Sequence, residues 1–414
     1  MRGKAGLVGQ PPWRRAGKLR AGGQSRDRQD AARHPPPGAP GRPGGGASAP
    51  TPGFKDQNEY VRAKASGVRF TTPRRQLEVM FAEPTEVVVR DDRRQNNFDL
   101  RVYLGVLSGN AAEKQTAKTD RIKESIAGYL VFMKEKYGVE PAAFSINEWD
   151  YGPTRQTPRE HAILIKTLGP YFASRGLATK LMLGDISHPY PISLINEGLN
   201  DPEVAKYVYA LSYHSWTSGT DANLAEWDAA AQAMNVPLLI AEGGLDPSTH
   251  QYPQMFVEPF YALREIELYE RILALSRPTS ILHWQLTADY SLLAGGGIYR
   301  DNGPLRPTQR FWNVKQLAST PPNVFFLPAK CDRPGLTCSA YGNAASGVYA
   351  VHVVNMGAAR PTTLTGLPAE VKQLRVWVTD EQRGMQEGAR IPVTNGKAQF
   401  TLDQTSYTTL ISAQ

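Results

Sequence analysis

Short apolar segments alternate with amphipathic helical segments between residues 120 and 319, and no other feature limits the folds open to this chain as strongly. Each repeat takes roughly 30 residues, so its helix returns the chain to the end at which the next strand starts. Such repeats produce parallel strands, either in a doubly wound sheet or in a (β/α)8 TIM barrel, and we predict the barrel over residues 93–320. The predicted strands are 142–147, 180–186, 209–213, 238–241 and 281–285, and the predicted helices are 120–137, 158–175, 201–206, 221–234, 256–275 and 308–317.

The preceding region, residues 54–118, contains apolar segments without the helices that a barrel needs between its strands. Three further strand–helix units would have to come before the strand at 142–147 to make eight. We therefore expect residues 54–92 to give their strands to a second, β-rich domain, and the first barrel units to be incomplete or atypical. The predicted strands in this region are 68–71, 77–81, 86–89 and 100–107.

Only β-strand patterns follow residue 320. Asn395-Gly396 lies between two apolar segments and is a strong signal for a two-residue hairpin turn, because both turn positions need a positive φ. We predict an antiparallel β-sandwich over residues 321–414. Its predicted strands are 324–327, 347–355, 362–364, 374–379, 398–402 and 407–412.

The net charge of +8 does not indicate a nucleic-acid-binding protein, because it belongs to one end of the chain. Residues 1–53 contain ten Lys or Arg and two Asp or Glu, whereas the remaining residues include 37 of each sign. The body of the protein therefore has no net field to attract a polyanion. The same 53 residues hold 12 Gly and 9 Pro and show little periodicity, so we expect a disordered tail. No segment approaches the roughly 18 apolar residues of a membrane span.

The two cysteines, Cys331 and Cys338, flank a Pro-Gly turn signal and can meet across a hairpin. A disulfide is favoured here over two free thiols, and an oxidising compartment suits a disulfide. We therefore expect a secreted or periplasmic protein. The basic N-terminal residues are not followed by the apolar segment of a signal peptide, so the cytoplasm is the alternative location.

Polar and aromatic residues gather where the predicted strands end. In a parallel barrel these ends share one face, on which active sites are built. Two carboxylates accompanied by several aromatic and few basic residues are typical of a carbohydrate site, which needs an acid–base pair and stacking surfaces. The candidate residues are Asn147, Glu148, Trp149, Asp185, His188, Tyr190, Tyr213, His214, Trp216, Glu242 and Trp284.

The order and spacing of these candidates resemble glycoside hydrolase clan A. Asn147 and Glu148 end one strand, and Glu242 ends another strand 94 residues later, followed by two glycines. The segment around His214 is similar to strand six of the clan, and Trp284 lies where the clan has its strand-eight tryptophan. The C-terminal sandwich resembles that of families 30 and 39. The usual Asn-Glu-Pro motif reads Asn-Glu-Trp in this chain.

This resemblance implies a retaining β-glycoside hydrolase with two catalytic glutamates. Glu242 would be the nucleophile, Glu148 the acid/base, and Asn147 the partner of the sugar 2-hydroxyl. His214 or Tyr213 would contact the nucleophile, and the clan tryptophan of strand eight would form the sugar platform. The remaining residues expected to bind substrate are Trp149, Asp185, His188 and Trp216.

Other chemistries lack support in the sequence. The chain has no HExxH, paired CxxC, GxGxxG or phosphate-loop motif, and its seven His residues show no metal-ligand spacing. We therefore expect a carbohydrate partner, no nucleic acid, no cofactor and no metal. The alternative function is a catalytically inactive carbohydrate-binding protein on the same scaffold.

Overall fold

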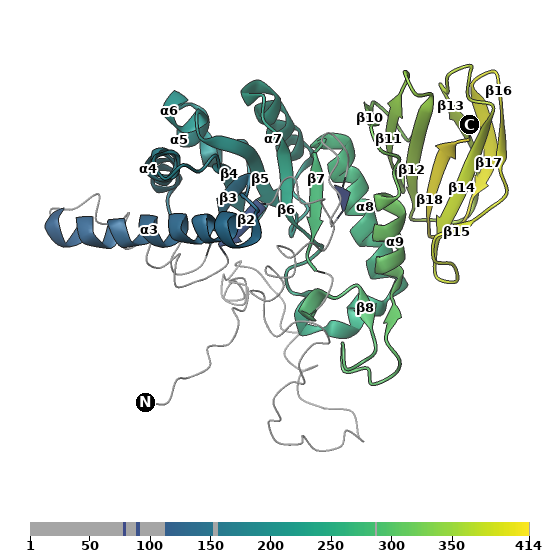
Figure 1. The fold of residues 1–414 in the computed structure, drawn as a ribbon. Coiled ribbons are helices and arrows are strands. Elements are labelled where there is room, and N and C mark those ends of the chain that lie inside the picture. Colours follow the sequence, from purple (N-terminus) through teal and green to yellow (C-terminus); the bar gives the residue numbers. More distant parts are fainter. Residues whose placement is uncertain (1–77, 80–87, 92–111, 152–155, 286–287, 414) are drawn as a thin grey trace, which may run out of the picture.

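A parallel β-sheet with helices on its outside and an antiparallel β-sandwich make up the described chain (Figure 1). The computed structural model describes residues 78–79, 88–91, 112–151, 156–285 and 288–413. Residues 1–53, predicted to form a disordered tail, lie outside the described residues. The predicted (β/α) barrel followed by a β-sandwich is confirmed.

The described strands of the parallel sheet follow the order β1-β7-β6-β5-β4-β3-β2. From β3 to β7, neighbours in the sheet are also neighbours along the chain, as in a (β/α) barrel, so the carboxyl ends of these strands share one face. The strands are β1 (Glu78–Val79), β2 (Val88–Asp91), β3 (Ala143–Ile146), β4 (Lys180–Ile186), β5 (Val208–His214), β6 (Leu238–Gly243) and β7 (Ser280–His283).

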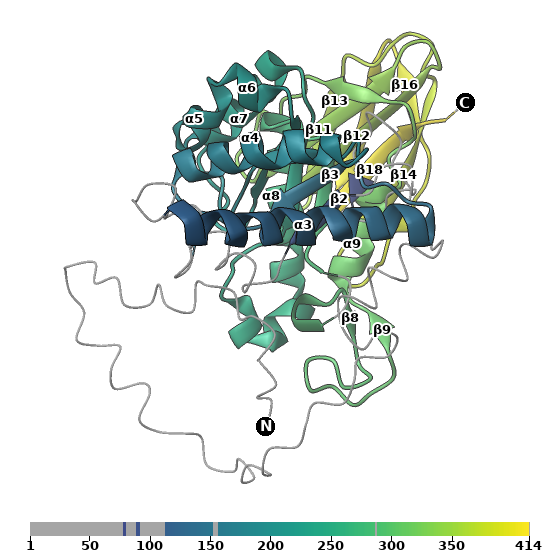
Figure 2. The same cartoon turned by 60° about the vertical axis from the view of Figure 1, so that its left-hand side comes forward.

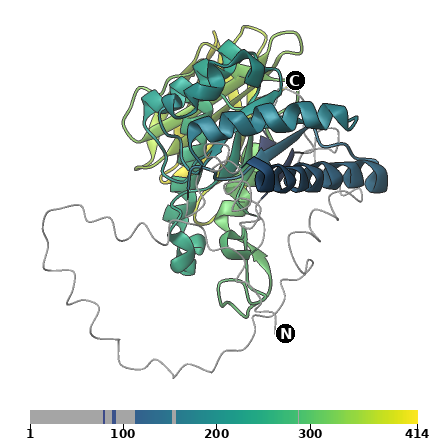
Figure 3. The ribbon, with the colours of Figure 1, turned by 90° about the vertical axis from the view of Figure 1, so that its left-hand side faces the viewer.

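Helices connect these strands and cover the outside of the sheet, with α3 and α4 side by side (Figures 2 and 3). Helix α4 starts at Pro158, as predicted, and a capping box holds this start: the Thr157 hydroxyl accepts from the Glu160 N–H, and the Glu160 carboxylate accepts from the Thr157 N–H. None of the described helices is long and apolar enough to cross a bilayer. The helices are α3 (Ala112–Tyr137), α4 (Pro158–Ser174), α5 (Asn196–Leu199), α6 (Pro202–Ala205), α7 (Asp221–Met234), α8 (Pro259–Leu275) and α9 (Gln309–Ala318).

The two described strands ahead of α3 belong to the parallel sheet and not to the sandwich. Residues of β1 pair with β7, starting at Glu78 opposite Ser280, and residues of β2 pair with β3, starting at Val88 opposite Ala143. The expectation that residues 54–92 join the sandwich is therefore wrong for β1 and β2, and the rest of that range lies outside the described residues. Without β1 and β2, the strands β7 and β3 would be the edges of the parallel sheet. Their outer backbone N–H and C=O groups need hydrogen-bond partners, and β1 and β2 supply them.

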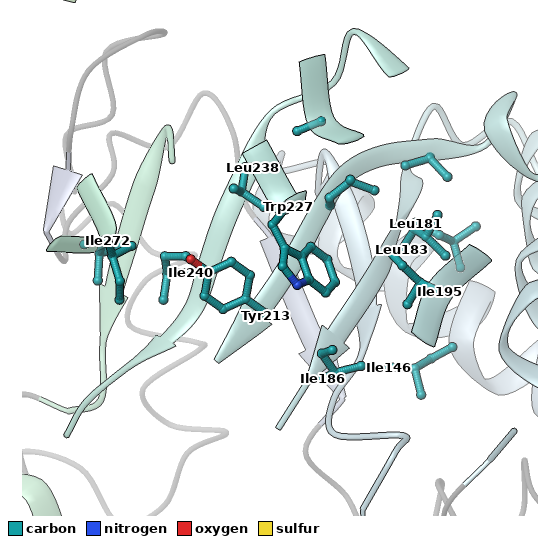
Figure 4. Close-up of a cluster of buried hydrophobic side chains, with 14 of the residues drawn as sticks. Ile146, Leu181, Leu183, Ile186, Ile195, Tyr213, Trp227, Leu238, Ile240 and Ile272 are labelled. Carbon is teal, nitrogen blue, oxygen red and sulfur yellow. The ribbon is translucent and has the colours of Figure 1, made fainter. Parts of the chain in front are cut away.

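Side chains of β5 alternate between the two faces of the sheet. Leu211 and Tyr213 point outward into the cluster between sheet and helices, where the Tyr213 ring lies 5.2 Å from the Trp227 ring of α7 (Figure 4). Ala210 belongs to a separate cluster of small strand residues on the other face. His214 shares the face of Ala210 and therefore points to the interior at the end of its strand.

The sandwich packs against α8 and α9 through β11, β12, β14 and β18. Asn395 and Gly396 both have positive φ, 51° and 71°, and turn β16 into β17, as predicted. The predicted disulfide between Cys331 and Cys338 is present. The strands are β10 (Phe325–Leu327), β11 (Leu336–Asn343), β12 (Val348–Asn355), β13 (Arg360–Thr365), β14 (Gln373–Thr379), β15 (Gln386–Glu387), β16 (Ile391–Thr394), β17 (Lys397–Leu402) and β18 (Ser406–Ser412).

Candidate active site

Glu148 and Glu242 lie at the carboxyl ends of two strands of the sheet. Glu148 comes two residues after β3, and its N–H donates to the Asp185 carbonyl at the end of β4 (2.8 Å). It has a left-handed backbone, with φ of 47°, which a residue with a side chain adopts only where its surroundings enforce it. Glu242 is the penultimate residue of β6 and is almost fully buried. Both carboxylates are thus fixed by backbone geometry.

The imidazole of His214, at the end of β5, joins the two glutamates. Its Nδ1 lies 3.4 Å from Oε1 of Glu148 and 3.2 Å from Oε2 of Glu242. One oxygen of each glutamate and a ring nitrogen of His214 all lie within 4.8 Å of one another. The two carboxyl groups are therefore close enough to act on the same small group of atoms.

Asp185 holds the other side of the His214 ring. The Nε2 of His214 lies 2.8 Å from Oδ1 of Asp185, and the hydroxyl of Ser145 on β3 donates to Oδ2 of the same carboxylate. Asp185 and His214 are completely buried. Asp185 was predicted to bind substrate; the structure instead places its buried carboxylate against Ser145 and His214, where it holds the imidazole ring in place.

The charges of this cluster shift the proton affinities of its members. Burial alone would lower the pKa of His214, but the negative charge of Glu242 and the hydrogen bonds that the ring donates to Asp185, Glu148 and Glu242 outweigh it and hold that pKa well above 6.5. Burial, together with the charge of Glu242, raises the pKa of Glu148, although His214 opposes the shift. At neutral pH, His214 is therefore a cation beside a carboxyl group that keeps its proton more readily than an exposed glutamate.

Aromatic residues surround the Glu242 side of the site. The indole Nε1 of Trp216 donates to Oε2 of Glu242 (3.1 Å), and its ring packs 5.2 Å from that of Tyr290. Both rings belong to a cluster with Phe256, against which Trp284 packs. Trp284 follows β7 and is only partly buried, and its backbone N–H donates to the carbonyl of Gly243, the residue after Glu242 (2.8 Å). The Trp216 indole thus lies beside Glu242, and the backbone of Trp284 lies beside Gly243; sugar contact by either residue stays a prediction.

Two predicted substrate-binding residues are directed away from the site. Tyr213 is completely buried among the helices, and its hydroxyl donates to the Ser276 hydroxyl (2.7 Å). Trp149 is buried too, and its indole N–H donates to the Gly184 carbonyl (2.6 Å) while its ring stacks on His161. The substrate-binding predictions for Tyr213 and Trp149 are wrong, because both side chains fill space between the sheet and α4 or α7.

Asn147 and His188 keep positions at the strand ends. Asn147 directly precedes Glu148 and is partly exposed. His188 follows β4, and its ring lies 5.4 Å from the ring of Tyr190. Burial and the nearby positive charge of His214 lower the pKa of His188 to about 4, so it is neutral at physiological pH. Both residues stay candidates for substrate contact.

Sequence reasoning missed Asp150 and Arg310. Asp150 accepts from the N–H and hydroxyl of Ser187, 2.9 and 2.6 Å, and so ties the segment after β3 to that after β4. Arg310 on α9 is completely buried and pairs with Glu265 of α8 through two nitrogens, 2.9 and 2.8 Å. Asp150 could have been predicted as a site residue, because it lies only two residues after Glu148. Nothing in the sequence singled out Arg310, because its partners are remote in sequence.

The three central side chains also offer ligand atoms for a metal ion. Their oxygens and ring nitrogen come from β3, β5 and β6, and the hydrogen bond from His214 to Asp185 resembles the support that metal-binding histidines receive. These residues are far apart in the chain, so a search for local metal-binding motifs could not have detected this group of ligand atoms. Sensitivity to chelators therefore belongs in any test of the site.

Solved structures with a similar fold include xylanases of glycoside hydrolase family 30. A family 30 endoxylanase from Clostridium papyrosolvens C71 matches with a TM-score of 0.59 and 20% identity over 72% of both chains. A family 30 subfamily 8 xylanase from Clostridium acetobutylicum matches with a TM-score of 0.60 and 16% identity, again over 72% of both chains. The chain has the fold of family 30 glycoside hydrolases.

A third family 30 structure gives a similar match. The catalytic domain of xylanase C from Talaromyces cellulolyticus, also of family 30, matches over 71% of this chain and 68% of its own, with 16% identity and a TM-score of 0.53. No family sequence model and no curated protein matches the chain. The clan resemblance in the sequence is thus confirmed by the family 30 fold, while the chemistry has to be argued from the site.

Proposed function

We propose that this protein is a retaining β-glycoside hydrolase that cleaves O-glycosidic bonds by double displacement. The proximity of Glu148 and Glu242 carries the proposal, because one oxygen of each lies within 4.8 Å of the other. Retaining enzymes hold their two carboxyl groups about 5–5.5 Å apart, whereas inverting enzymes separate them by about 6.5–9.5 Å to admit a water molecule. The observed distance favours direct attack by one carboxylate.

In the first step, a carboxylate oxygen of Glu242 attacks the anomeric carbon while the bond from this carbon to the glycosidic oxygen breaks. The proton of Glu148 passes to the departing oxygen, which leaves as an alcohol. In the second step, the ionised Glu148 takes a proton from water, and the water oxygen attacks the anomeric carbon. Glu242 is released as a carboxylate and Glu148 regains its proton.

The neighbouring charges suit these two roles. The His214 cation and the Trp216 N–H stabilise negative charge on Glu242, which the nucleophile must carry. The raised pKa of Glu148 favours the protonated form that the leaving group requires. Loss of this proton at higher pH should therefore set the alkaline limb of the activity for substrates with poor leaving groups.

The first experiment measures release of the aryl alcohol from a panel of activated aryl β-glycosides. Because the solved structures of this fold include xylanases, aryl β-xyloside and xylan come first, followed by β-glucoside, β-galactoside and β-fucoside. Activity that persists in a chelator supports the two-glutamate mechanism. Sugar binding without release would instead favour the inactive carbohydrate-binding protein, and loss of activity in chelator would favour a metal-dependent hydrolase.

Two variants test the separate roles of the glutamates. Glu242→Ala should lose turnover, and added azide should restore it with a glycosyl azide of inverted configuration, because the small anion fills the place of the carboxylate. Glu148→Gln should slow substrates with poor leaving groups by about 100-fold or more, while activated substrates lose much less. Equal losses for both kinds of substrate would contradict the role of Glu148.

A further inference from the structure

The segments that follow β3 and β4 form a second group of polar and aromatic side chains, on the Glu148 side of the site. Asp150 and Tyr151 come directly after Glu148, and Ser187, His188 and Tyr190 follow β4. The mechanism uses none of them. The aromatic cluster of Trp216 and Trp284 lies instead beside Glu242.

Several hydrogen bonds fix the segment after β4 in place. Ser187 is bound to Asp150 through its N–H and its hydroxyl. The carbonyl of Pro189 accepts from the Asn223 amide (3.0 Å), and the carbonyl of Tyr190 accepts from the Trp227 indole (2.8 Å). A segment held at successive residues presents its side chains with little loss of entropy on binding, which is what a sugar-stacking ring requires.

Tyr190 is the exposed member of this group. Its side chain is 39% exposed, and one edge of its ring rests against His188 at 5.4 Å between centroids. Burial of part of the residue raises the pKa of its phenol, and the nearby charges of Asp150 and Glu148 act in the same direction. The segment that carries Tyr190 is tied to the one that carries Glu148 by the Asp150–Ser187 hydrogen bonds.

The geometry of nucleophilic attack indicates what the Glu148 side of the site has to bind. Glu242 attacks the anomeric carbon from one face, so the leaving group departs from the opposite face, toward the carboxyl group that protonates it. The departing part of a substrate is thus received by residues next to Glu148. An activated aryl group departs readily without such help because it is a good leaving group. A departing sugar is a poor leaving group and offers an apolar ring face that an aromatic side chain can stack against.

We propose that Tyr190, held by the Asp150–Ser187 hydrogen bonds, is a leaving-group subsite that binds the departing sugar of a β-linked oligosaccharide or polysaccharide. This inference rests on the proposed glycosidase function and adds its substrate class. Tyr190 contacts the departing sugar itself. Asp150 acts indirectly, as a positioning residue for the segment that carries Tyr190.

The test compares two substrates of the sugar that the wild type accepts, an activated aryl β-glycoside and the corresponding β-linked trisaccharide. Tyr190→Ala should lower kcat/KM for the trisaccharide about tenfold, the effect of losing one stacked ring, and leave the aryl glycoside within about twofold. Tyr190→Phe keeps the ring and should retain most of the trisaccharide activity. Tyr252→Ala is the matched control, because Tyr252 is 61% exposed but lies on the segment after β6.

A second readout uses transfer to an added sugar acceptor, which enters through the same subsite as the departing sugar. Tyr190→Ala should reduce the fraction of glycosyl-enzyme that transfers to the acceptor, with hydrolysis by water unchanged. Equal loss with both substrates, or no loss with the trisaccharide, would overturn the subsite. No aryl alcohol release from the wild type would instead overturn the proposed function, so the two failures are distinguishable.

Discussion

His214 brings a completely buried positive charge to the site, between the carboxyl groups of Asp185 and Glu242. A buried charge without partners would be strongly unfavourable, and here Asp185 compensates on one side of the ring and Glu242 on the other. With both ring nitrogens protonated, the imidazolium donates toward Asp185 through Nε2 and faces the glutamates through Nδ1. The arrangement keeps one positive charge next to a carboxylate that must attack as an anion.

A substitution of Asp185 tests this arrangement. In Asp185→Asn the charged acceptor is lost, so the pKa of His214 should fall from its raised value toward or below 6.5, and the ring should lose its proton near neutral pH. We expect kcat/KM at pH 7 to fall about tenfold or more, with partial recovery at lower pH where His214 is protonated again. Nitrogen NMR of the imidazole checks the protonation state directly.

Ser145→Ala is the control for this prediction. It removes a hydrogen bond to Asp185 but leaves the carboxylate charge in place. His214 should stay protonated and the pH dependence should keep its wild-type shape. A pH profile of Asp185→Asn that is merely scaled down, without a change of shape, would contradict the electrostatic role of Asp185.

At the level of elements, α9 contacts and holds in place the segments after β6 and β7, which carry the aromatic cluster. The guanidinium of Arg310 donates through Nη1 to the carbonyls of Tyr290 and Ser291, 3.2 and 2.9 Å, and lies 4.7 Å from the centre of the Phe256 ring. Its Nη2 also donates to Nε2 of His283 (3.3 Å), the residue before Trp284. One side chain thus fixes the segments after β6 and β7.

Substitutions in the Arg310–Glu265 pair distinguish the effect of Arg310 on the position of these segments from its effect on the stability of the fold. Arg310→Met leaves Glu265 buried without its partner and should lower the free energy of unfolding by about 3–5 kcal/mol. In the double variant Arg310→Met, Glu265→Met, apolar packing replaces both charges, and much of the stability should return. Activity should stay at least about tenfold below wild type, since the two carbonyls still lack their donor.

Thermal melting and aryl glycoside kinetics of these variants check the prediction. Arg383→Met in the sandwich, which breaks the ion pairs to Asp380 and Asp403, serves as the matched control for loss of a charged pair. It should leave turnover unchanged. Recovery of activity together with stability in the double variant would show that Arg310 acts on stability alone.

The sequence predicted those elements whose signals are local. Helix α4 has its capping box and β16–β17 its Asn-Gly turn, so both were located correctly. The pairing of β1 and β2 with β7 and β3 depends on which sheet edge needs a partner, a property of the assembled sheet that local patterns do not contain. This is why β1 and β2 were assigned to the wrong domain.

The same distinction applies to the site. Glu148, Glu242 and His214 were predicted from strand ends, and they do meet. Tyr213 was assigned to the site together with its neighbour His214, although adjacent residues of a strand point to opposite faces, and it lies among the helices. Trp149 follows Glu148 after the strand has ended, where no periodicity defines a direction, and its ring turns toward His161.

At the level of the whole molecule, a buried polar network joins the barrel to the sandwich. Glu270 of α8 accepts a hydrogen bond from the Tyr407 hydroxyl of β18 (2.7 Å) and another from the Ser339 hydroxyl of β11. The ring of His352 on β12 lies within 3.0 Å of the same Tyr407 hydroxyl, and burial lowers its pKa to about 3, so it provides no positive charge. Glu270 thus sits in the interface with hydroxyl partners and without an ion pair among the described residues.

This environment makes the stability of the molecule depend on pH. Burial raises the pKa of Glu270 from 4.5 to about 7, so the folded protein keeps this proton up to about pH 7, whereas the unfolded chain loses it near pH 4.5. Between these values the folded state binds more protons than the unfolded state, and the free energy of unfolding therefore falls as pH rises. At about 1.4 kcal/mol per pH unit, the Glu270 contribution should decline by about 3 kcal/mol from pH 4.5 to pH 7 and change little above it.

Glu270→Gln should remove this pH dependence, because glutamine fills nearly the same volume and hydrogen-bonds to both hydroxyls without ionising. Its free energy of unfolding in urea, measured at pH 5, 6, 7 and 8, should therefore exceed that of the wild type at pH 8 and approach it at pH 5. Glu387→Gln, which neutralises an exposed sandwich carboxylate paired with Arg375, should follow the wild-type slope. If Glu270→Gln kept that slope as well, the carboxyl group would have to be ionised in the folded protein, and the interface would have to contain a compensating positive charge.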